Sequence, residues 1–371
     1  MSLRVKILGI GSAALAAVVV SLMVALSRNS PCEAPASPPE GVTLMKATTY
    51  SCYGSHEVLR LEDIPKPTPA DDELLVRVRA AAINPLEWHY MQGTPYIMRL
   101  SSGLGKPTTT RLGVDFAGTV EAVGRNVERF QPGDEVFGGR NGALAEYLTV
   151  REHGAVARKP GNVTFEEAAA VGVAATTALQ ALRDRGNLQP GQRVLINGAS
   201  GGVGTFAVQI AKALGAHVTG VSSTRNLELV RSLGADHVID YTAENFTEGS
   251  QRWDLIIDNV GNHPLRAYRR VLGPEGIVVL VGGPKDDPWL GPLTRVARAA
   301  IYSRLVSQSF PALLAELNQE DLILLGSLME SGQVGSVIDG RYPLSEVPAA
   351  IEYLEQGRSR GKNVVSVGAD P

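Results

Sequence analysis

The chain has 371 residues, a formal net charge of −3 and 44% hydrophobic side chains. This length predicts two domains of ordinary size, and the near-neutral charge gives no electrostatic reason to expect a nucleic-acid partner. Only two cysteines are present, Cys32 and Cys52, so the sequence supports neither a disulfide framework nor a four-thiolate structural zinc site.

The N-terminal residues 1–27 contain an uncharged apolar run from Ile7 to Leu26. As a helix this run is about 30 Å long, which matches the hydrocarbon thickness of a bilayer. We therefore expect an N-terminal apolar helix that acts as a single-pass membrane anchor. The alternative is a signal peptide that is cleaved, giving a secreted or periplasmic protein. A Pro-rich linker follows at residues 28–44.

Two different patterns follow the linker. Residues 45–165 contain short β-type segments that are separated by Pro-Gly and Gly-Gly turns. From residue 166 the period becomes helical, and from residue 193 short apolar strands alternate with helices. This alternation predicts an α/β fold with a parallel sheet that is covered by helices on both faces.

A glycine-rich turn, "NGASGGVG", joins the predicted strand that ends at Asn197 to the helix that follows. Its pattern is A-x-G-x-x-G from Ala199 to Gly204. If the turn binds a dinucleotide, Gly201 lets the backbone approach the pyrophosphate, and Gly204 lets the helix pack closely on the strand. The helix N-terminus then offers free N–H groups and a partial positive charge. The alternative is a tight turn between a strand and a helix, with no ligand.

The end of the next strand bears on the choice of coenzyme. It leads into Ser223, Thr224 and Arg225, and no carboxylate follows until Glu228. A carboxylate at this place binds the ribose of NAD, whereas hydroxyls and a guanidinium bind a 2′-phosphate. The sequence therefore favours NADPH over NADH. Ser223 and Thr224 can also simply cap the following helix.

Six motifs in this order carry a resemblance to a known family: "LGVDFAGTVEAVG", "QPGDEVFG", "TTALQAL", "NGASGGVGTFAVQIAK", "LGADHVIDY" and "GKNVV". From Met45 to Val367 the chain resembles the zinc-independent quinone oxidoreductase branch of the medium-chain dehydrogenase/reductase superfamily. The resemblance implies a GroES-like catalytic domain at residues 45–165 and 308–371, and a Rossmann domain at residues 166–307. It also implies NADPH in the cleft between them, and it is the only reason to expect a homodimer.

The resemblance also assigns site residues. Thr177 matches a threonine under the nicotinamide ring, and Arg225 must supply the charge for the 2′-phosphate alone, because many relatives place a Lys where Asn226 stands. The coenzyme contacts carried over are Ala199, Ser200, Gly201, Gly202, Val203, Gly204, Ser223, Thr224, Arg225, Tyr241, Val260, Gly261, Gly282, Gly283, Lys362 and Asn363.

The zinc ligands of the alcohol dehydrogenases in this superfamily are missing. Asn84 stands near the position of their Cys, and Val114 and Asp115 replace their His and Glu. Zinc needs three or four converging ligands, so we expect no metal here, and His89 is expected to be structural or to line the pocket. A hydride acceptor that needs no Lewis acid then fits best, which means a quinone or an enone.

Asn84 is the candidate to bind the developing enolate oxygen or the nicotinamide ribose, although Asn84-Pro85 is equally typical of a turn that ends a strand. Tyr96 lies within one residue of the proton-donating tyrosine of related enoyl-thioester reductases, and Tyr90 is its rival. Both tyrosines are also explained as packed aromatics in the cleft wall.

The leading hypothesis is an NADPH-dependent reductase of quinones or α,β-unsaturated carbonyls. An enoyl-thioester reductase is a second possibility, but it needs a basic entry, and no dense cluster of Lys and Arg is present in the sequence. A membrane-tethered NADPH-binding adaptor without turnover is a third. Arg4 and Lys6 would send the enzyme domain out of the cytoplasm, whereas NADPH is intracellular, so the side of the membrane stays open.

Overall fold

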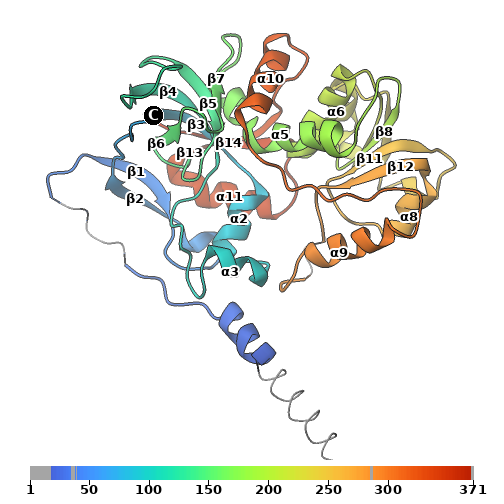
Figure 1. Cartoon of the computed structure of the whole chain (residues 1–371), viewed down its shortest axis with the longest axis horizontal. Helices are drawn as coiled ribbons and strands as arrows, with labels where there is room; N and C mark the ends of the chain where they lie inside the picture. Colours follow the sequence, from blue (N-terminus) through green and yellow to red (C-terminus); the bar gives the residue numbers. More distant parts are fainter. Residues whose placement is uncertain (1–17, 35–37, 39, 285–286, 369–371) are drawn as a thin grey trace, which may run out of the picture.

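The structure is a computed structural model that describes residues 18–34, 38, 40–284 and 287–368. This part of the chain contains a seven-stranded sheet, a five-stranded sheet and a two-stranded sheet (Figure 1). The two-stranded sheet is the antiparallel pair β1 (Leu44–Thr49) and β2 (Arg60–Pro65). The result is an α/β fold with a GroES-like part and a Rossmann-like part, as the sequence predicts.

The seven-stranded sheet has the order β13-β14-β3-β4-β5-β7, and β6 pairs with β3 outside this path. Its last strand, β14, comes from the C-terminal end of the chain and pairs antiparallel with β3, so that Asn363 lies opposite Ile83. The strands are β3 (Glu73–Ile83), β4 (Asp115–Val123), β5 (Glu135–Gly139), β6 (Tyr147–Arg151), β7 (Val156–Arg158), β13 (Ile338–Pro343) and β14 (Lys362–Ser366).

The five-stranded sheet is parallel throughout and has the order β10-β9-β8-β11-β12. The strand order reverses between β8 and β11, and ligands of such sheets bind outside the carboxyl ends of the strands at this point. The strands are β8 (Arg193–Asn197), β9 (His217–Ser222), β10 (His237–Asp240), β11 (Trp253–Asp258) and β12 (Leu272–Leu280).

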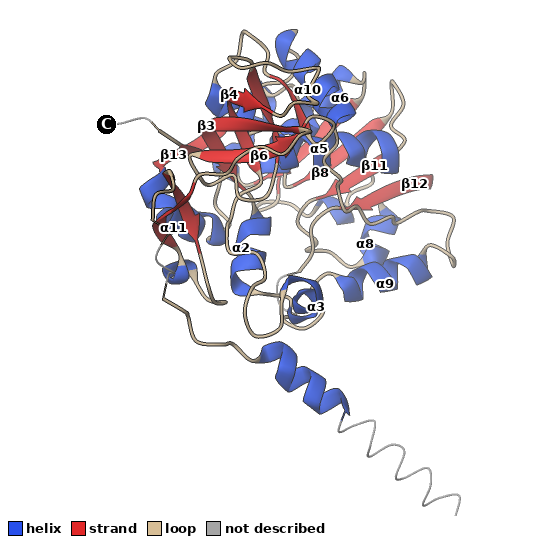
Figure 2. Ribbon diagram, turned by 60° about the vertical axis from the view of Figure 1, so that its left-hand side comes forward, coloured by secondary structure: helices blue, strands red, loops and turns tan. Residues whose placement is uncertain are grey.

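Helices cover both faces of this sheet, as Figure 2 shows. Val194 and Ile196 of β8 pack into one core cluster with α5 and α6, and Leu195 packs into another with α8 and α9. Successive side chains of a strand point to opposite faces, so an uninterrupted apolar strand requires this double cover. The α-helices are α2 (Pro85–Gln92), α3 (Arg99–Ser102), α4 (Phe165–Ala169), α5 (Gly172–Gln180), α6 (Gly202–Ala213), α7 (Leu227–Ser232), α8 (Leu265–Arg270), α9 (Leu293–Tyr302), α10 (Gln319–Glu330) and α11 (Val347–Glu355).

Short helical turns connect several of these elements. The stretch η3 (Ala181–Arg185) extends α5 as a π-helix. The 3-10 turns are η1 (His56–Val58), η2 (Tyr96–Met98), η4 (Thr224–Asn226), η5 (Phe246–Glu248) and η6 (Leu344–Glu346).

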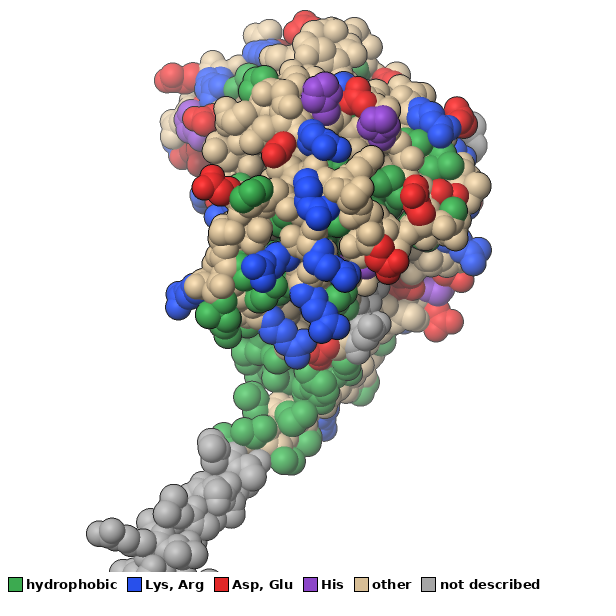
Figure 3. Space-filling model, turned by 90° about the vertical axis from the view of Figure 1, so that its right-hand side faces the viewer, with side chains coloured by type: hydrophobic (Ala, Val, Ile, Leu, Met, Phe, Trp, Pro, Cys, Tyr) green, Lys and Arg blue, Asp and Glu red, His purple; other side chains and the backbone are tan. Residues whose placement is uncertain are grey.

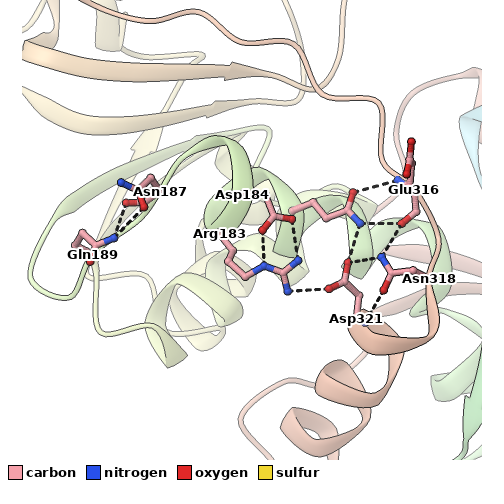
Figure 4. A network of polar contacts seen from close by, with 8 residues as sticks. Arg183, Asp184, Asn187, Gln189, Glu316, Asn318 and Asp321 are labelled. Carbon is pink, nitrogen blue, oxygen red and sulfur yellow. Dashed lines mark hydrogen bonds and ion pairs between the residues drawn. The ribbon is translucent and has the colours of Figure 1, made fainter.

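A polar network fixes the beginning of α10 against the end of α5 (Figure 4). Asp321 accepts hydrogen bonds from Arg183 and Gln180, each at 2.7 Å, and from Asn318 at 2.9 Å. Asn318 in turn caps α10 by accepting the N–H of Asp321 at 2.8 Å. Burial alone would raise the pKa of Asp321, but the hydrogen bonds from Arg183, Gln180 and Asn318 lower it below its usual value. The network therefore holds α10 in place through an ionised carboxylate.

The helices α8 and α9 carry a basic outer face, which Figure 3 shows as a band of Lys and Arg side chains. The exposed arginines of these helices are Arg266, Arg269, Arg270 and Arg298, and Arg304 follows α9. The sequence shows no dense cluster because these arginines come from two separate segments. Tyr268 of α8 and Ala299 of α9 belong to one core cluster, and this packing brings the segments together.

The N-terminal segment requires a correction. Most of the predicted anchor Ile7–Leu26 lies outside the described residues, which begin at residue 18 and are helical to residue 27. Within the described part of the chain, no helix is long and apolar enough to cross a membrane. The prediction of a single-pass anchor is therefore not upheld. The structure also pairs Cys32 with Cys52 in a disulfide, which the sequence analysis did not predict.

Candidate active site

The glycine-rich turn lies at the carboxyl end of β8, directly before α6. Packing explains why glycine is needed at one position of this turn but not at another. A Cβ on Gly204 would lie 2.1 Å from the carbonyl oxygen of Gly198, so the close packing of helix and strand excludes any side chain there. Gly201 has a φ of −83°, and the nearest atom to a Cβ there is the same oxygen at 3.6 Å. The fold therefore requires glycine at 204 and leaves open space at 201.

The open space adjoins the N-terminus of α6. Gly201 is the N-cap residue, and its cap has no side-chain hydrogen bond. The first N–H groups of a helix have no partner within the helix, and they carry the positive end of its dipole. Of the other turn residues, Ala199 is buried and donates its N–H to the carbonyl of Val221, whereas Ser200 and Val203 are half-buried. No side-chain atom lies within 4 Å of a Cβ at Gly201, so this helix N-terminus is a candidate anion site.

The C-terminal strand reaches the same turn. Gly361 forms a parallel bridge with Gly201 and donates its N–H to the carbonyl of Ser200 at 2.9 Å. The side chain of Lys362 passes beside the helix start, because a Cβ on Gly202 would lie 3.2 Å from its Cδ. The sequence motifs "ASGGVG" and "GKN" are therefore neighbours in space, although 157 positions or more separate them.

The predicted 2′-phosphate residues gather at the ends of β9 and β10. Ser223 is the N-cap of η4, and Asn226 links the two loops by donating to Ser200 at 3.0 Å and to Ser223 at 3.2 Å. Arg225 is exposed and donates to the carbonyl of Arg358 at 2.6 Å. Tyr241 is exposed beside this group.

The sequence analysis did not identify one carboxylate that lies at this edge. Thr224 donates its hydroxyl to Asp240 at 2.5 Å, and Thr242 donates to the same carboxylate at 2.7 Å. These hydroxyl hydrogen bonds lower the pKa of Asp240, so the carboxylate is ionised at neutral pH. Asp240 ends β10, the strand beside β9, and the usual search for an acidic residue at the end of the second strand does not reach it.

The predicted contacts at the ends of β11 and β12 lie together. A Cβ on Gly261 would be 2.7 Å from the Cα of Gly283, and one on Gly282 would be 2.0 Å from the carbonyl oxygen of Asn259. These glycines are thus explained by the close approach of two loops. Val260 is partly exposed and lies beside Gly198 of the glycine turn.

A buried ion pair anchors this region. Asp258, at the end of β11, pairs with Arg295 of α9 at 2.6 Å. It also accepts the side-chain amide of Asn197 at 2.9 Å and the backbone N–H of Gly261 at 2.9 Å. Arg295 further donates to the carbonyl of Gly282 at 3.2 Å. The loops that follow β8, β11 and β12 are therefore held in one arrangement by a fully paired charge.

A second buried network lies where β3, β4, β14 and α5 meet. The ammonium of Lys362 donates to the side-chain oxygen of Asn84 and, at 3.1 Å, to Asp115. Asn84 donates its amide to the same carboxylate at 3.0 Å, and the other carboxylate oxygen of Asp115 accepts the N–H of Val173 at 2.7 Å. Val173 lies in the first turn of α5, whose dipole favours a carboxylate. Gly172 is required here, because its Cβ would lie 2.3 Å from Asp115.

Glu87 extends this network from the first turn of α2. It is 2% exposed and accepts the backbone N–H of Asn84 at 2.7 Å, while its second oxygen has no hydrogen-bond partner among the described residues. Burial, followed by repulsion from Asp115, raises its pKa from 4.5 to about 7, and Lys362 opposes this shift. Glu87 is therefore the titratable group of the site that changes charge near neutral pH.

The remaining predicted residues lie around this network. Thr177 is buried one turn along α5 from Val173 and donates its hydroxyl to the carbonyl of that residue at 2.6 Å. Asn363 donates its amide to Ser359 at 3.0 Å, and its side-chain oxygen is buried without a partner among the described residues. His89 contacts the carbonyl of Thr94 through Nδ1 at 2.8 Å. This contact is of the structural kind, which was one of the two roles expected for His89.

Tyr96 contacts the loop between β12 and α9. Its ring packs edge-on against Trp289 with the centroids 5.0 Å apart, and its N–H donates to the carbonyl of Pro288 at 2.7 Å. On its other side the Arg99 guanidinium lies 4.8 Å from the ring centroid. The Tyr96 ring is thus packed against an indole and a guanidinium. Tyr90, the rival candidate, is partly exposed on α2.

The donor set does not fit zinc. In the part of the chain that the structure describes, no group of three or more His, Cys, Asp or Glu side chains is placed to hold a metal ion. At the position of the missing zinc ligands, Asp115 is the one anionic donor, and its oxygens are bonded to Lys362, Asn84 and Val173. The Lys362 ammonium therefore already balances the negative charge of Asp115.

Comparison with known proteins places this geometry in a family. Residues 70–161 match the alcohol dehydrogenase GroES-like domain, and residues 233–365 match the zinc-binding dehydrogenase family. The chain is 36% identical over 336 residues to a 2-methylene-furan-3-one reductase from Solanum lycopersicum, which covers 86% of this chain and 79% of that protein. The chain belongs to the quinone oxidoreductase branch of the medium-chain dehydrogenase/reductase superfamily.

Two further relatives agree with this assignment. An NADPH-dependent alkenal/one oxidoreductase of Arabidopsis thaliana, named as chloroplastic, is 35% identical over 86% of this chain and 79% of its own. The solved structure of a quinone oxidoreductase from Coxiella burnetii superposes with a TM-score of 0.77 at 31% identity, over 88% of this chain and all of that one. The chain is thus an oxidoreductase of a family that uses a nicotinamide coenzyme.

Proposed function

We propose that this oxidoreductase reduces quinones or α,β-unsaturated carbonyls with NADPH and without zinc. The proposal depends mainly on the open backbone at Gly201, where the fold leaves room at a helix N-terminus although packing does not demand a glycine. The names of the related proteins supply the acceptor classes, namely quinones, alkenals or enones and a furanone.

The preference for NADPH is supported by the charges at the edge of β9. The guanidinium of Arg225 is exposed at this edge, where it is held by the backbone carbonyl of Arg358. Asp240 opposes a 2′-phosphate, because the hydroxyls of Thr224 and Thr242 keep its carboxylate ionised, so the preference depends on the arginine. Arginine binds phosphate with paired, charge-assisted hydrogen bonds, which favours NADPH over NADH.

The proposed coenzyme contacts follow from which predicted residues lie next to one another in the site. The turn from Ala199 to Gly204 binds the pyrophosphate, residues 223–225 bind the 2′-phosphate, and Tyr241 borders the adenosine. The nicotinamide half lies among Val260, Gly261, Gly282, Gly283, Thr177 and Asn363. The division into domains at residues 165/166 and 307/308 stays a prediction, as does a homodimer.

The chemistry without zinc depends on the buried network. Bound NADPH supplies the hydride, and the protein must then stabilise the negative charge that develops on the acceptor oxygen. Asn84 has two amide N–H donors, of which one is used by Asp115, and its other donor can bind that oxygen. Lys362 fixes the orientation of this amide by donating to its oxygen. Lys362 thus acts through Asn84, which differs from its expected role as a direct coenzyme contact.

The test of this function uses the full chain with NADPH or NADH and a panel of quinones and enones. We expect NADPH to be oxidised with at least one acceptor, as followed at the nicotinamide absorbance band, with a zinc chelator leaving the rate unchanged. Tight NADPH binding without oxidation by any acceptor would instead support the non-enzymatic adaptor. A rate that the chelator abolishes and added zinc restores would refute the zinc-free mechanism.

A further inference from the structure

The segment 26–34 lies outside the parts of the chain that match the family and nevertheless binds a buried arginine within residues 70–161. Its main partner is Arg99 of α3, which is 1% exposed. One nitrogen of this guanidinium, Nη1, donates to the carbonyls of Leu26 and Arg28, at 2.9 and 3.2 Å, and to the side-chain oxygen of Asn29 at 2.9 Å. The segment therefore supplies most of the acceptors for one side of a buried cation.

The other side of the same guanidinium holds the loop that carries Tyr96. Its Nε donates to the carbonyl of Gly93 at 2.8 Å, and its Nη2 donates to the carbonyl of Gln92 at 3.1 Å. The rings of Tyr53 and Tyr96 lie 4.3 and 4.8 Å from the guanidinium carbon, and both contacts have cation–π geometry. A buried cation that loses acceptors is destabilised, so its position depends on the segment being in place.

A covalent bond ties the segment to this cluster. Cys32 is exposed and forms a disulfide with Cys52, which is buried directly before Tyr53. Besides its bonds to Arg99, the segment makes a backbone hydrogen bond from Ser30 to Gly105 at 2.7 Å and a surface ion pair between Glu33 and Lys106 at 2.6 Å. Surface ion pairs contribute little to stability. The disulfide is thus the strongest single bond between the segment and the catalytic part.

We propose that Cys32 and Cys52 form a redox-modification site, a dithiol–disulfide switch that docks the segment 26–34 on Arg99 and thereby sets the position of Tyr96. A cellular dithiol is the reactant. Its thiolate attacks the exposed sulfur of Cys32, the sulfur–sulfur bond breaks, and two electrons and two protons convert the pair to thiols while the reactant becomes a disulfide. The proposal rests on the proposed function in one respect, because its kinetic readout requires the protein to reduce a quinone.

The compartment in which NADPH is available bears on whether this disulfide is oxidised or reduced. NADPH is supplied in compartments where thiols are kept reduced, and disulfides in such compartments are commonly transient and redox-sensing. The two cysteines are separated by 20 positions, and loss of a crosslink of this size is expected to raise the undocked population of the segment by roughly a hundredfold. A change of this size is sufficient to switch a contact that is otherwise held by hydrogen bonds.

The experiment compares the full chain in oxidised form, after treatment with dithiothreitol, and as the Cys32→Ser variant. Cys32 is exposed, so this variant does not disturb the core, whereas Cys52 is buried. Two readouts are followed. The first is the rate of tryptic cleavage at Arg28, whose carbonyl is bound by Arg99 only when the segment is docked. The second is KM for a quinone together with kcat.

We expect dithiothreitol to raise cleavage at Arg28 at least tenfold and KM at least threefold, with both values restored by reoxidation. The Cys32→Ser variant should match the reduced protein and be insensitive to dithiothreitol. Equal cleavage in all three samples would overturn the switch. Faster cleavage with unchanged KM and kcat would overturn its link to Tyr96. If the chain oxidises NADPH with no acceptor, the proposed function fails, but the cleavage assay still decides whether the disulfide docks the segment.

Discussion

The buried carboxyl group of Glu87 allows a quantitative test of the site. Its pKa is raised from 4.5 to about 7, first by burial and then by Asp115. The folded protein therefore holds this proton more tightly than the unfolded chain does. The corresponding stability is fully present below pH 4.5 and is lost as the pH rises to about 7, because ionisation then places an extra negative charge beside Asp115.

The magnitude follows from the size of the shift. A gap of about 2.5 pKa units between the folded and unfolded states corresponds to roughly 3 kcal/mol in the free energy of unfolding. In Glu87→Gln the side chain is neutral at every pH and its oxygen can still accept the N–H of Asn84. The variant should therefore lack the loss of stability between pH 5 and pH 8 that the wild-type protein shows.

The assay is urea unfolding of both proteins at pH 5, 6, 7 and 8. We expect the difference in unfolding free energy between the variant and the wild type to change by about 2.5 kcal/mol over this range, in favour of the variant at high pH. Glu57→Gln is the matched control, because Glu57 lies in a helical turn but is exposed, and it should follow the wild type. A constant difference between Glu87→Gln and the wild type would refute the argument that Glu87 titrates near neutrality.

Three other substitutions test separate parts of the account. Lys362→Met should lower the free energy of unfolding by about 3–5 kcal/mol in urea, because it leaves Asp115 buried without its cation, and adding Asp115→Asn should recover part of this loss. Gly204→Ala should reduce Tm sharply in a thermal scan, since its Cβ would clash with the carbonyl of Gly198, and an unchanged Tm would contradict the packing argument. Arg225→Ala should raise KM for NADPH by about ten- to a hundredfold and leave KM for NADH nearly unchanged, and an equal effect on both would contradict the 2′-phosphate site.

Much of the coenzyme half of the fold could be predicted from local patterns. The alternation of apolar strands and helices after residue 193 determines a parallel sheet, because strands buried on both faces need cover from both sides. The glycine turn was located correctly for the same local reason. The sequence could not separate the roles of its glycines, since the clash at Gly204 and the free space at Gly201 depend on how the turn folds back on Gly198.

The catalytic half depends on contacts between distant parts of the chain. Lys362 and Asn84 are 278 positions apart, and their hydrogen bond exists only because β14 pairs with β3. No local pattern indicates such a partner, and the coenzyme contact expected of Lys362 stays a prediction. The raised pKa of Glu87 was missed for the same reason, because it results from burial next to Asp115.

The N-terminal region shows the limits of composition as evidence. An apolar run of about 20 residues predicted a membrane anchor, but the described part holds no helix that can span a bilayer. The cysteine count predicted no disulfide framework, and the single disulfide between Cys32 and Cys52 requires the linker to fold back along α3. Composition does not contain this information, because the contact is tertiary.

The central claim is that the bare backbone at Gly201 binds the phosphates of the coenzyme, and one measurement tests it directly. The NADPH dissociation constant is measured by nicotinamide fluorescence for the wild type, for Gly201→Val and for Gly161→Val. Both glycines have an ordinary φ and room for a side chain, so both variants should fold with unchanged Tm. We expect Gly201→Val to bind NADPH more weakly by roughly tenfold or more, because it blocks charge-assisted hydrogen bonds to phosphate, and Gly161→Val to bind normally. Wild-type affinity in a folded Gly201→Val protein would contradict the claim.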